Sequence, residues 1–127
     1  MTDRELFSSG APWEKTFGYS RAVKIGNTIE VAGTTSVLNG KVIHPEDPYL
    51  QTKQILSIID ESLQSFGADL SHVVRTRIFM TNIKDFEAIG KAHGEAFADV
   101  RPASTALEVS AFVNPDMLVE IEVTAVI

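Results

Sequence analysis

The chain has 127 residues, of which 44% are hydrophobic, which is enough for one compact domain and too few for two ordinary ones. Its net charge of −6 argues against a surface that follows nucleic-acid phosphates, and the absence of cysteine excludes disulfides, thiolate metal sites and a cysteine nucleophile. No apolar run is long enough to span a membrane, and the polar segment at residues 1–10 is unlike a signal peptide. We therefore expect a soluble, cytoplasmic protein with one domain, residues 1–127, in which residues 1–17 form an N-terminal arm.

The first part of this domain has the pattern of short strands and tight turns. Residues 19–25 and 28–35 are strand-like runs joined by Gly26-Asn27, a pattern typical of a β-hairpin. Asn39-Gly40 then predicts a second turn. Residues 41–43 follow it, and we expect them to form a short edge strand.

From Asp47 to Phe66 the hydrophobic period changes to that of a helix. Leu56, Ile59 and Leu63 share one stripe with Phe66. Asp47 and the proline after it suit the N-cap and first helical position, and Gly67 suits the C-terminal stop. The segment therefore predicts an amphipathic helix.

The second half alternates strand and helix. Residues 73–80 are rich in β-branched and aromatic side chains and predict a strand. A second helix is expected at about residues 85–98, ended by Arg101-Pro102, because a residue before proline disfavours helix. Residues 103–110 and 117–126 are the remaining strands. Two helix-to-strand crossovers of the usual hand place both helices on one face of a single sheet.

Alternation along the last three strands then sorts their side chains into two faces. We expect the helices to cover one face of these strands, which carries residues 74, 76, 78 and 80 of the first, residues 103, 105, 107 and 109 of the second, and residues 119, 121, 123 and 125 of the third. The opposite, open face would then carry Arg75, Arg77, Ser104, Glu108, Glu120 and Glu122. This face is either a solvated surface with ion pairs across strands, or a surface that packs against other copies of the chain.

Several catalytic motifs can be weighed directly. His93-Gly94-Glu95 is similar to the H-x-E of zinc deaminases, but that chemistry also needs a cysteine pair, so we reject it. His93 is then expected as a hydrogen-bonded helix residue at a packing surface, with a pocket role as the alternative. His44 and His72 have no partner at metal-ligand spacing. The sequence also lacks the glycine-rich nucleotide-binding motifs and the G-x-S-x-G motif of serine hydrolases. We expect no metal site.

Three stretches together resemble the RidA/YjgF family: GYSRAVKIGNTIEVAGT, VVRTRIFMTNIKDFEAIGKAHGEAF and RPASTALEV followed by VEIEVTAV. The resemblance runs from about Tyr19 to Val126. It implies a chorismate-mutase-like α+β fold, a single domain with one mixed β-sheet of about six strands and two helices packed on one face. It also implies a homotrimer with three clefts at subunit interfaces, no cofactor, and hydrolysis of reactive imines and enamines to ketoacids and ammonia.

The resemblance assigns roles to individual residues of this cleft. Tyr19 would flank the substrate, and Gly33 would let the backbone approach it closely. Glu120 matches the family's carboxylate, and the resemblance implies that it orients a water for attack on the imine carbon. Without the resemblance, these residues would be interpreted as a core tyrosine, a bulge glycine and a solvated glutamate.

The same comparison shows three departures from the family's pattern. Ser104 stands where the archetype has an arginine for the substrate carboxylate, Ala106 replaces a cysteine, and Gly90 replaces an asparagine. Because a desolvated carboxylate needs a charged partner, we expect weak binding of the usual 2-iminoacids. Ser104 and Thr105 would instead hydrogen-bond a polar group.

Another arginine could replace the missing one. The candidates are Arg75, Arg77 and Arg101. Arg77 is the first choice, because strand alternation directs its side chain toward the cleft. The competing interpretation is an ion pair between Arg77 and Glu108 or Glu122.

Three functions are therefore open. The first is a cofactor-free hydrolase of imine or related C–N bonds with a substrate other than the usual 2-iminoacids. The second is a non-catalytic protein that binds a small metabolite in the same clefts. The third, ribonuclease or translation inhibition, follows an older name of the family and is disfavoured by the acidic balance of the chain. The expected partners are copies of the chain itself and a small metabolite, with no nucleic acid and no membrane.

Overall fold

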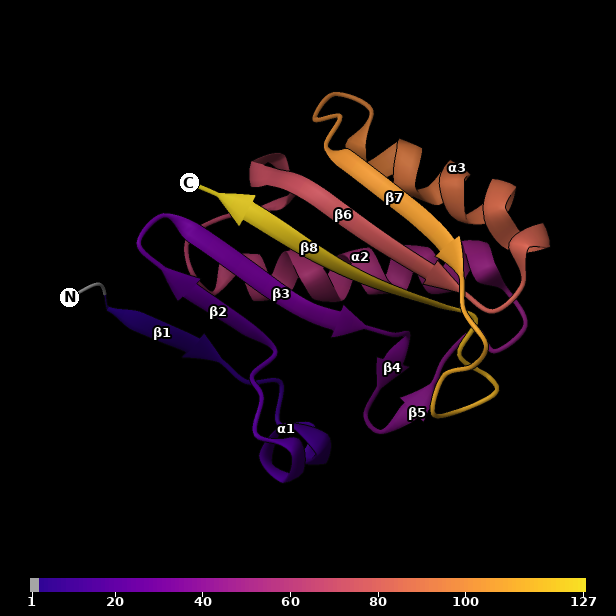
Figure 1. Cartoon of the computed structure of the whole chain (residues 1–127), viewed down its shortest axis with the longest axis horizontal. Helices are drawn as coiled ribbons and strands as arrows, with labels where there is room; N and C mark the ends of the chain where they lie inside the picture. The colour runs from indigo at the N-terminus through magenta and orange to yellow at the C-terminus, as the bar shows by residue number, and fades with distance from the viewer. Residues whose placement is uncertain (1–2) are drawn as a thin grey trace.

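A six-stranded mixed β-sheet forms the centre of the molecule, and the computed structural model describes it within residues 3–127 (Figure 1). The strand order is β1-β2-β3-β8-β6-β7. β6 and β7 are parallel, and the other neighbouring pairs are antiparallel. The strands of this sheet are β1 (Arg4–Phe7), β2 (Ala22–Ile25), β3 (Thr28–Thr34), β6 (Val73–Met80), β7 (Ala103–Glu108) and β8 (Val119–Val126).

Two long helices, α2 (Pro48–Gln64) and α3 (Phe86–Phe97), lie on one face of this sheet, as the crossovers predict (Figure 1). The side chain of Asp47 accepts a hydrogen bond from the backbone N–H of Leu50 at 2.9 Å, which caps the first turn of α2. Gly67 follows α2 with a φ of +78°, a conformation that glycine adopts without strain. The short 3₁₀ helices η1 (Leu70–His72) and η2 (Ile83–Asp85) precede β6 and α3.

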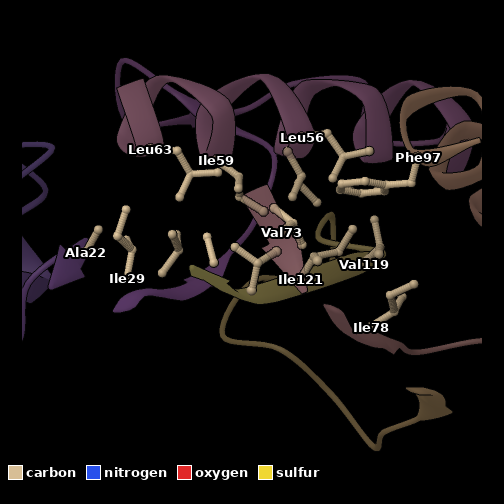
Figure 2. Packing of buried hydrophobic residues seen from close by; sticks show 14 of the residues in the cluster. Ala22, Ile29, Leu56, Ile59, Leu63, Val73, Ile78, Phe97, Val119 and Ile121 are labelled. Carbon is tan, nitrogen blue, oxygen red and sulfur yellow. The ribbon is translucent and has the colours of Figure 1, made fainter. Parts of the chain in front are cut away.

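The hydrophobic core lies between α2 and the sheet (Figure 2). Leu56, Ile59 and Leu63 of α2 face Ile29 and Ile121 of the strands. The predicted alternation of β8 is confirmed, because its residues 119, 121, 123 and 125 are all buried. One face of the sheet is therefore covered, and the other face is open in the isolated chain.

The edge of the sheet differs from the sequence prediction. The sixth strand is β1, which comes from the expected N-terminal arm and pairs with β2 from Arg4 to Phe7. Its sequence has no clear alternation, so no strand was predicted there. The same arm contains the short helix α1 (Pro12–Phe17), which also lacked a sequence signal. Residues 1–2 of the arm lie outside the described residues.

The expected edge strand at residues 41–43 does not join the main sheet. Its residues form β5 (Lys41–Val42), which pairs with β4 (Val37–Leu38) in a separate two-stranded sheet. Asn39 and Gly40 both have positive φ, 53° and 78°, so the predicted turn is confirmed. This tight turn pairs Val37 with Val42 and Leu38 with Lys41.

The predicted faces of β7 are inverted. The parallel register pairs Ser104 with Thr76 and Ala106 with Ile78, whose side chains are buried on the helix side. Ser104, Ala106 and Glu108 therefore lie on the helix side, and residues 105 and 107 lie on the open face. Both sets of side chains on this edge strand mix small, polar and apolar residues, so its composition does not show which set is covered.

Glu108 also has a structural role in this position. Its carboxylate accepts a hydrogen bond from the backbone N–H of Ile83 at 2.8 Å. This N–H begins η2 and has no partner within the helix. The glutamate of β7 thus joins the edge strand to the segment that leads into α3.

The start of β6 departs from the prediction for a different reason. Val73 is buried and Val74 is 47% exposed, although Val74 was predicted to face the helices. The pairing of β6 with β8 shifts register between Val73 and Arg75. Such an irregularity changes the alternation by one residue, which the sequence pattern does not reveal.

Candidate functional site

Glu120 and Gly33 form the centre of a polar site on the open face. The pairing of β3 with β8 shifts register between Val31 and Thr34, so Ala32 and Gly33 occupy a β-bulge. A Cβ added to Gly33 would lie 2.9 Å from the carboxyl carbon of Glu120. Only glycine therefore lets this carboxylate rest against the strand in its observed position.

Glu120 has an altered acidity in this environment. Burial raises its pKa, the positive charge of Arg21 lowers it, and the neighbouring Glu122 raises it, with a net increase. A carboxyl group with a raised pKa holds its proton at a higher pH than usual and is a stronger base when ionised. These properties suit a group that positions or deprotonates water.

Arg21 is a residue of this site that the sequence prediction missed. Its guanidinium carbon lies 5.7 Å from the centre of the Tyr19 ring, a cation–π arrangement. Its Nε is buried and has no hydrogen-bond partner among residues 3–127. Tyr19 and Arg21 both lie in the irregular segment between α1 and β2, where no strand alternation relates their side chains, so no local sequence signal marks Arg21.

Arg21 also acts on a second, buried carboxylate. Burial raises the pKa of Glu14, but hydrogen bonds from Ser9 and Ser8 and the charge of Arg21 hold it below its usual value. In the described part of the chain, no ion pair within 4.0 Å joins Arg21 to Glu14 or Glu120. The guanidinium therefore influences both carboxylates without forming a close contact with either.

The arginines of β6 are occupied on the same face. Nη1 of Arg77 lies 3.6 Å from Oε1 of Glu122. Arg77 therefore forms an ion pair, as the competing interpretation proposed. Nη2 of Arg75 donates to the Thr105 hydroxyl at 2.7 Å. A shallow hollow of about 340 Å³ beside them is lined by Ser20, Val23, Glu30, Val31, Ala32, Arg77, Glu122 and Val123.

A second polar group lies on the helix side of β7. The hydroxyls of Thr76 and Ser104 are 2.8 Å apart, and the Thr76 hydroxyl is 2.9 Å from Nε2 of His93. The His93 ring packs on Phe97 with their centres 4.7 Å apart, and burial lowers the pKa of His93. His93 is thus a hydrogen-bonded residue at a packing surface, as one of its two interpretations proposed.

The remaining predicted residues surround this second group. Ala106 packs against the core from β7. Gly90 is exposed on α3, and a Cβ there would meet nothing within 4 Å. Arg101 is also exposed, with a φ of +56°, and its N–H bonds to Phe97 O at the end of α3.

The predicted site residues therefore form two groups in one chain. Tyr19, Gly33 and Glu120 belong to the open face, whereas Ser104 and His93 belong to the helix side. β6 separates β8 from β7 in the strand order. A single chain does not bring Glu120 and Ser104 together.

Comparison with known proteins identifies the family. A family model described as endoribonuclease L-PSP matches residues 11–127. A crystal structure of a member of the YjgF/YER057c/UK114 family from Mycobacterium tuberculosis superposes with a TM-score of 0.90 and 41% identity, covering 98% of this chain and 100% of that one. The chain belongs to the RidA/YjgF family.

Curated members of the RidA/YjgF family are similar over most of their length. An uncharacterized protein of Streptomyces coelicolor is 41% identical and the match covers 92% of this chain and 87% of the relative. The 3-aminoacrylate deaminase RutC of Acinetobacter baylyi is 34% identical, with 81% and 82% covered. The predicted family and the α+β single-domain fold with a mixed six-stranded sheet are thereby confirmed.

Within residues 3–127, no helix is both long and apolar enough to cross a membrane. The same residues contain no cluster of three or more histidine, aspartate or glutamate side chains that could hold a metal ion.

Proposed function

We propose that this protein binds a small metabolite in clefts between the chains of a homotrimer and hydrolyses an imine, enamine or related C–N bond there. The half-buried carboxylate of Glu120, held against Gly33 and with a raised pKa, is the observation that carries this proposal. The relative RutC, a 3-aminoacrylate deaminase by name, supports the same class of reaction.

The division of the site between two faces favours an assembly. Glu120 points from the open face of one chain, and Ser104 is exposed on the outer strand of the sheet, so a second copy has to supply one of them. The open face also carries apolar side chains, including Val74 and Leu107, which are 47% and 42% exposed. Packing of copies against this face would cover these residues and bring the two polar groups into one cleft.

The proposed reaction begins with a water held by Glu120. The water oxygen forms a bond to the imine carbon, its proton passes to the carboxylate, and the C=N electron pair moves to nitrogen. Glu120 passes this proton to the nitrogen, and a second proton comes from solvent. The C–N bond then breaks, ammonia leaves, and the hydroxyl group becomes the carbonyl group as its proton passes through Glu120 to solvent. A carboxylate with a raised pKa suits both transfers, because it accepts and releases a proton nearer to neutral pH.

The substrate is proposed to differ from the usual 2-iminoacids. Ser104 offers no charge to a carboxylate, Arg77 is paired with Glu122, and Arg75 is bonded to Thr105. Tyr19 would flank the ligand, Gly90, Ala106 and His93 would border its cleft, and Ser104 would hydrogen-bond an uncharged polar group of it. Thr105 and Arg77 lie on the open face, opposite Ser104, so in this proposal they contribute to the cleft from that face.

Ammonia release from 2-iminoacids tests the proposal directly. An amino-acid oxidase would generate the iminoacid, and release would be compared for the wild type, Ser104→Arg, Glu120→Gln and the double variant. Ser110→Arg adds the same charge at an exposed position just beyond β7 and serves as the control.

We expect slow release by the wild type and about 10-fold or faster release by Ser104→Arg, because hydrogen bonds between charged groups contribute about 1.5–3 kcal/mol. Glu120→Gln should abolish release in both backgrounds. A wild type as fast as Ser104→Arg would refute the assignment of a different substrate. Full activity of Glu120→Gln would refute the proposed role of the carboxylate.

A further inference from the structure

The chain of hydrogen bonds behind β7 joins the exposed hydroxyl of Ser104 to the half-buried imidazole of His93. Thr76 is fully buried on β6, with Ser104 Oγ at 2.8 Å on one side and His93 Nε2 at 2.9 Å on the other. Ser104 is exposed at its outer end. Because Thr76 has one hydroxyl proton, it can donate to only one of these two neighbours.

The proton on His93 decides the direction of the whole chain. With a proton on Nε2, His93 donates to Thr76 and Thr76 donates to Ser104, so the Ser104 proton is free to point outward. With Nε2 unprotonated, Thr76 donates to His93 and Ser104 donates inward to Thr76. The first arrangement makes Ser104 a donor to a ligand, and the second makes it an acceptor.

The surroundings of His93 favour the first arrangement. Among residues 3–127, Nδ1 forms no hydrogen bond, whereas Nε2 lies 2.9 Å from the Thr76 oxygen. The Thr76 hydroxyl donates to Ser104 Oγ at 2.8 Å, so its single proton is used there and it accepts from His93, which requires a proton on Nε2. The imidazolium form also carries a proton on Nε2, so both forms direct the Ser104 proton outward.

We propose that Thr76 and His93 are positioning residues that fix the Ser104 hydroxyl as a hydrogen-bond donor to an uncharged acceptor oxygen of the ligand, such as a ketone or amide carbonyl. This inference rests on the proposed function, which places Ser104 in the cleft. A single neutral donor satisfies a carbonyl oxygen, but it does not offset the desolvation of a carboxylate. The ligand class is therefore a neutral carbonyl compound.

Titration calorimetry on the assembled protein tests this inference with two probes, the neutral 2-oxobutanamide and the anionic 2-oxobutanoate. We expect the wild type to bind the amide about 10-fold more tightly than the acid. Ser104→Ala and Thr76→Val should each weaken amide binding about 3- to 10-fold, the effect of one directed hydrogen bond. Thr76→Ser keeps the hydroxyl and should restore the wild-type affinity.

Thr52→Val is the matched control for Thr76→Val. Thr52 is also fully buried, and its hydroxyl donates to Pro48 O at 2.7 Å within α2. Removing that hydroxyl should leave the affinities for both probes unchanged. A loss of amide binding equal to that of Thr76→Val would mean that any buried hydroxyl has this effect, and the inference would be wrong.

Nitrogen NMR of the His93 ring provides a second readout that does not need a ligand. We expect the neutral ring to carry its proton on Nε2, and we expect its chemical shifts to change in Thr76→Val but not in Thr52→Val. A proton on Nδ1 in the wild type would overturn the inference.

If both probes bind but Ser104→Ala and Thr76→Val leave amide binding intact, the inference alone fails. If the wild type binds neither probe, the proposed function fails and the inference with it.

Discussion

Glu120, Gly33 and Arg21 define the chemistry of the open face at the scale of single residues. The glycine provides the space for the carboxylate, and the arginine moderates the rise in its pKa. The same positive charge also lowers the pKa of the buried Glu14. The position of the Glu120 carboxylate therefore depends on Gly33, and its acidity depends on burial and on the charges of Arg21 and Glu122.

Substitution of Gly33 should separate the position of this carboxylate from the stability of the fold. In Gly33→Ala the new Cβ would lie 2.9 Å from Cδ of Glu120, so the flexible end of the glutamate has to move. Gly33 has no positive φ that would strain an alanine. We expect amide binding and ammonia release to fall at least about 10-fold, with the free energy of unfolding lowered by less than about 1 kcal/mol.

Urea unfolding and calorimetry on the same samples would check this prediction. Gly94→Ala, at an exposed glycine with open space around it, is the control. Gly33→Ala with normal ligand binding would show that the close approach to Glu120 has no functional role. A collapse of stability would show that the carboxylate cannot move aside.

The residues of the site differ in how well the sequence predicts them. Tyr19, Gly33 and Glu120 follow from the family resemblance, and the structure places Gly33 and Glu120 in contact. Arg21 and Thr76 matter through neighbours that are distant in sequence, so no local pattern identified them. Arg77 was predicted on the correct face, but its ion pair with Glu122 depends on the register of β6 against β8.

At the scale of elements, the two long helices were predicted within two residues of their observed ends because capping residues and apolar stripes mark them. β1 and α1 were missed because their side chains are mostly exposed and show no period. β7 was found as a strand, but its faces were inverted. The two faces of this edge strand differ too little in apolar content, so its alternation does not show which face the helices cover.

The two glycines of α3 give a prediction at this scale. Gly90 and Gly94 are both exposed, and a Cβ at either would meet nothing within 4 Å. Alanine at an exposed helix position is more favourable than glycine by about 0.5–1 kcal/mol. We therefore expect Gly90→Ala and Gly94→Ala each to raise the melting temperature by a few degrees at matched protein concentration.

Ligand binding should distinguish the two variants. If Gly90 borders the cleft, as the family resemblance implies, Gly90→Ala should weaken binding of 2-oxobutanamide, and Gly94→Ala should not. Equal affinities of both variants and the wild type would remove Gly90 from the proposed site. Scanning calorimetry and titration calorimetry supply the two measurements.

At the scale of the whole molecule, the residues assigned to one cleft lie on opposite faces of one sheet. The sequence predicted them on a common face, because it could not show that β7 pairs in parallel with β6 in the register that turns Ser104 toward the helices. The corrected geometry strengthens the case for an assembly, since one chain cannot close the cleft. The central claim is that Glu120 of one chain faces Ser104 of another.

Crosslinking with a short bismaleimide tests this claim most directly, because the natural chain has no cysteine to react. The reagent would be added to the double variant Ser104→Cys, Glu120→Cys and to each single variant, and the products separated on a denaturing gel. We expect covalently linked dimers and trimers from the double variant, and unlinked chains from both single variants. A double variant that remains entirely as single chains would contradict the account.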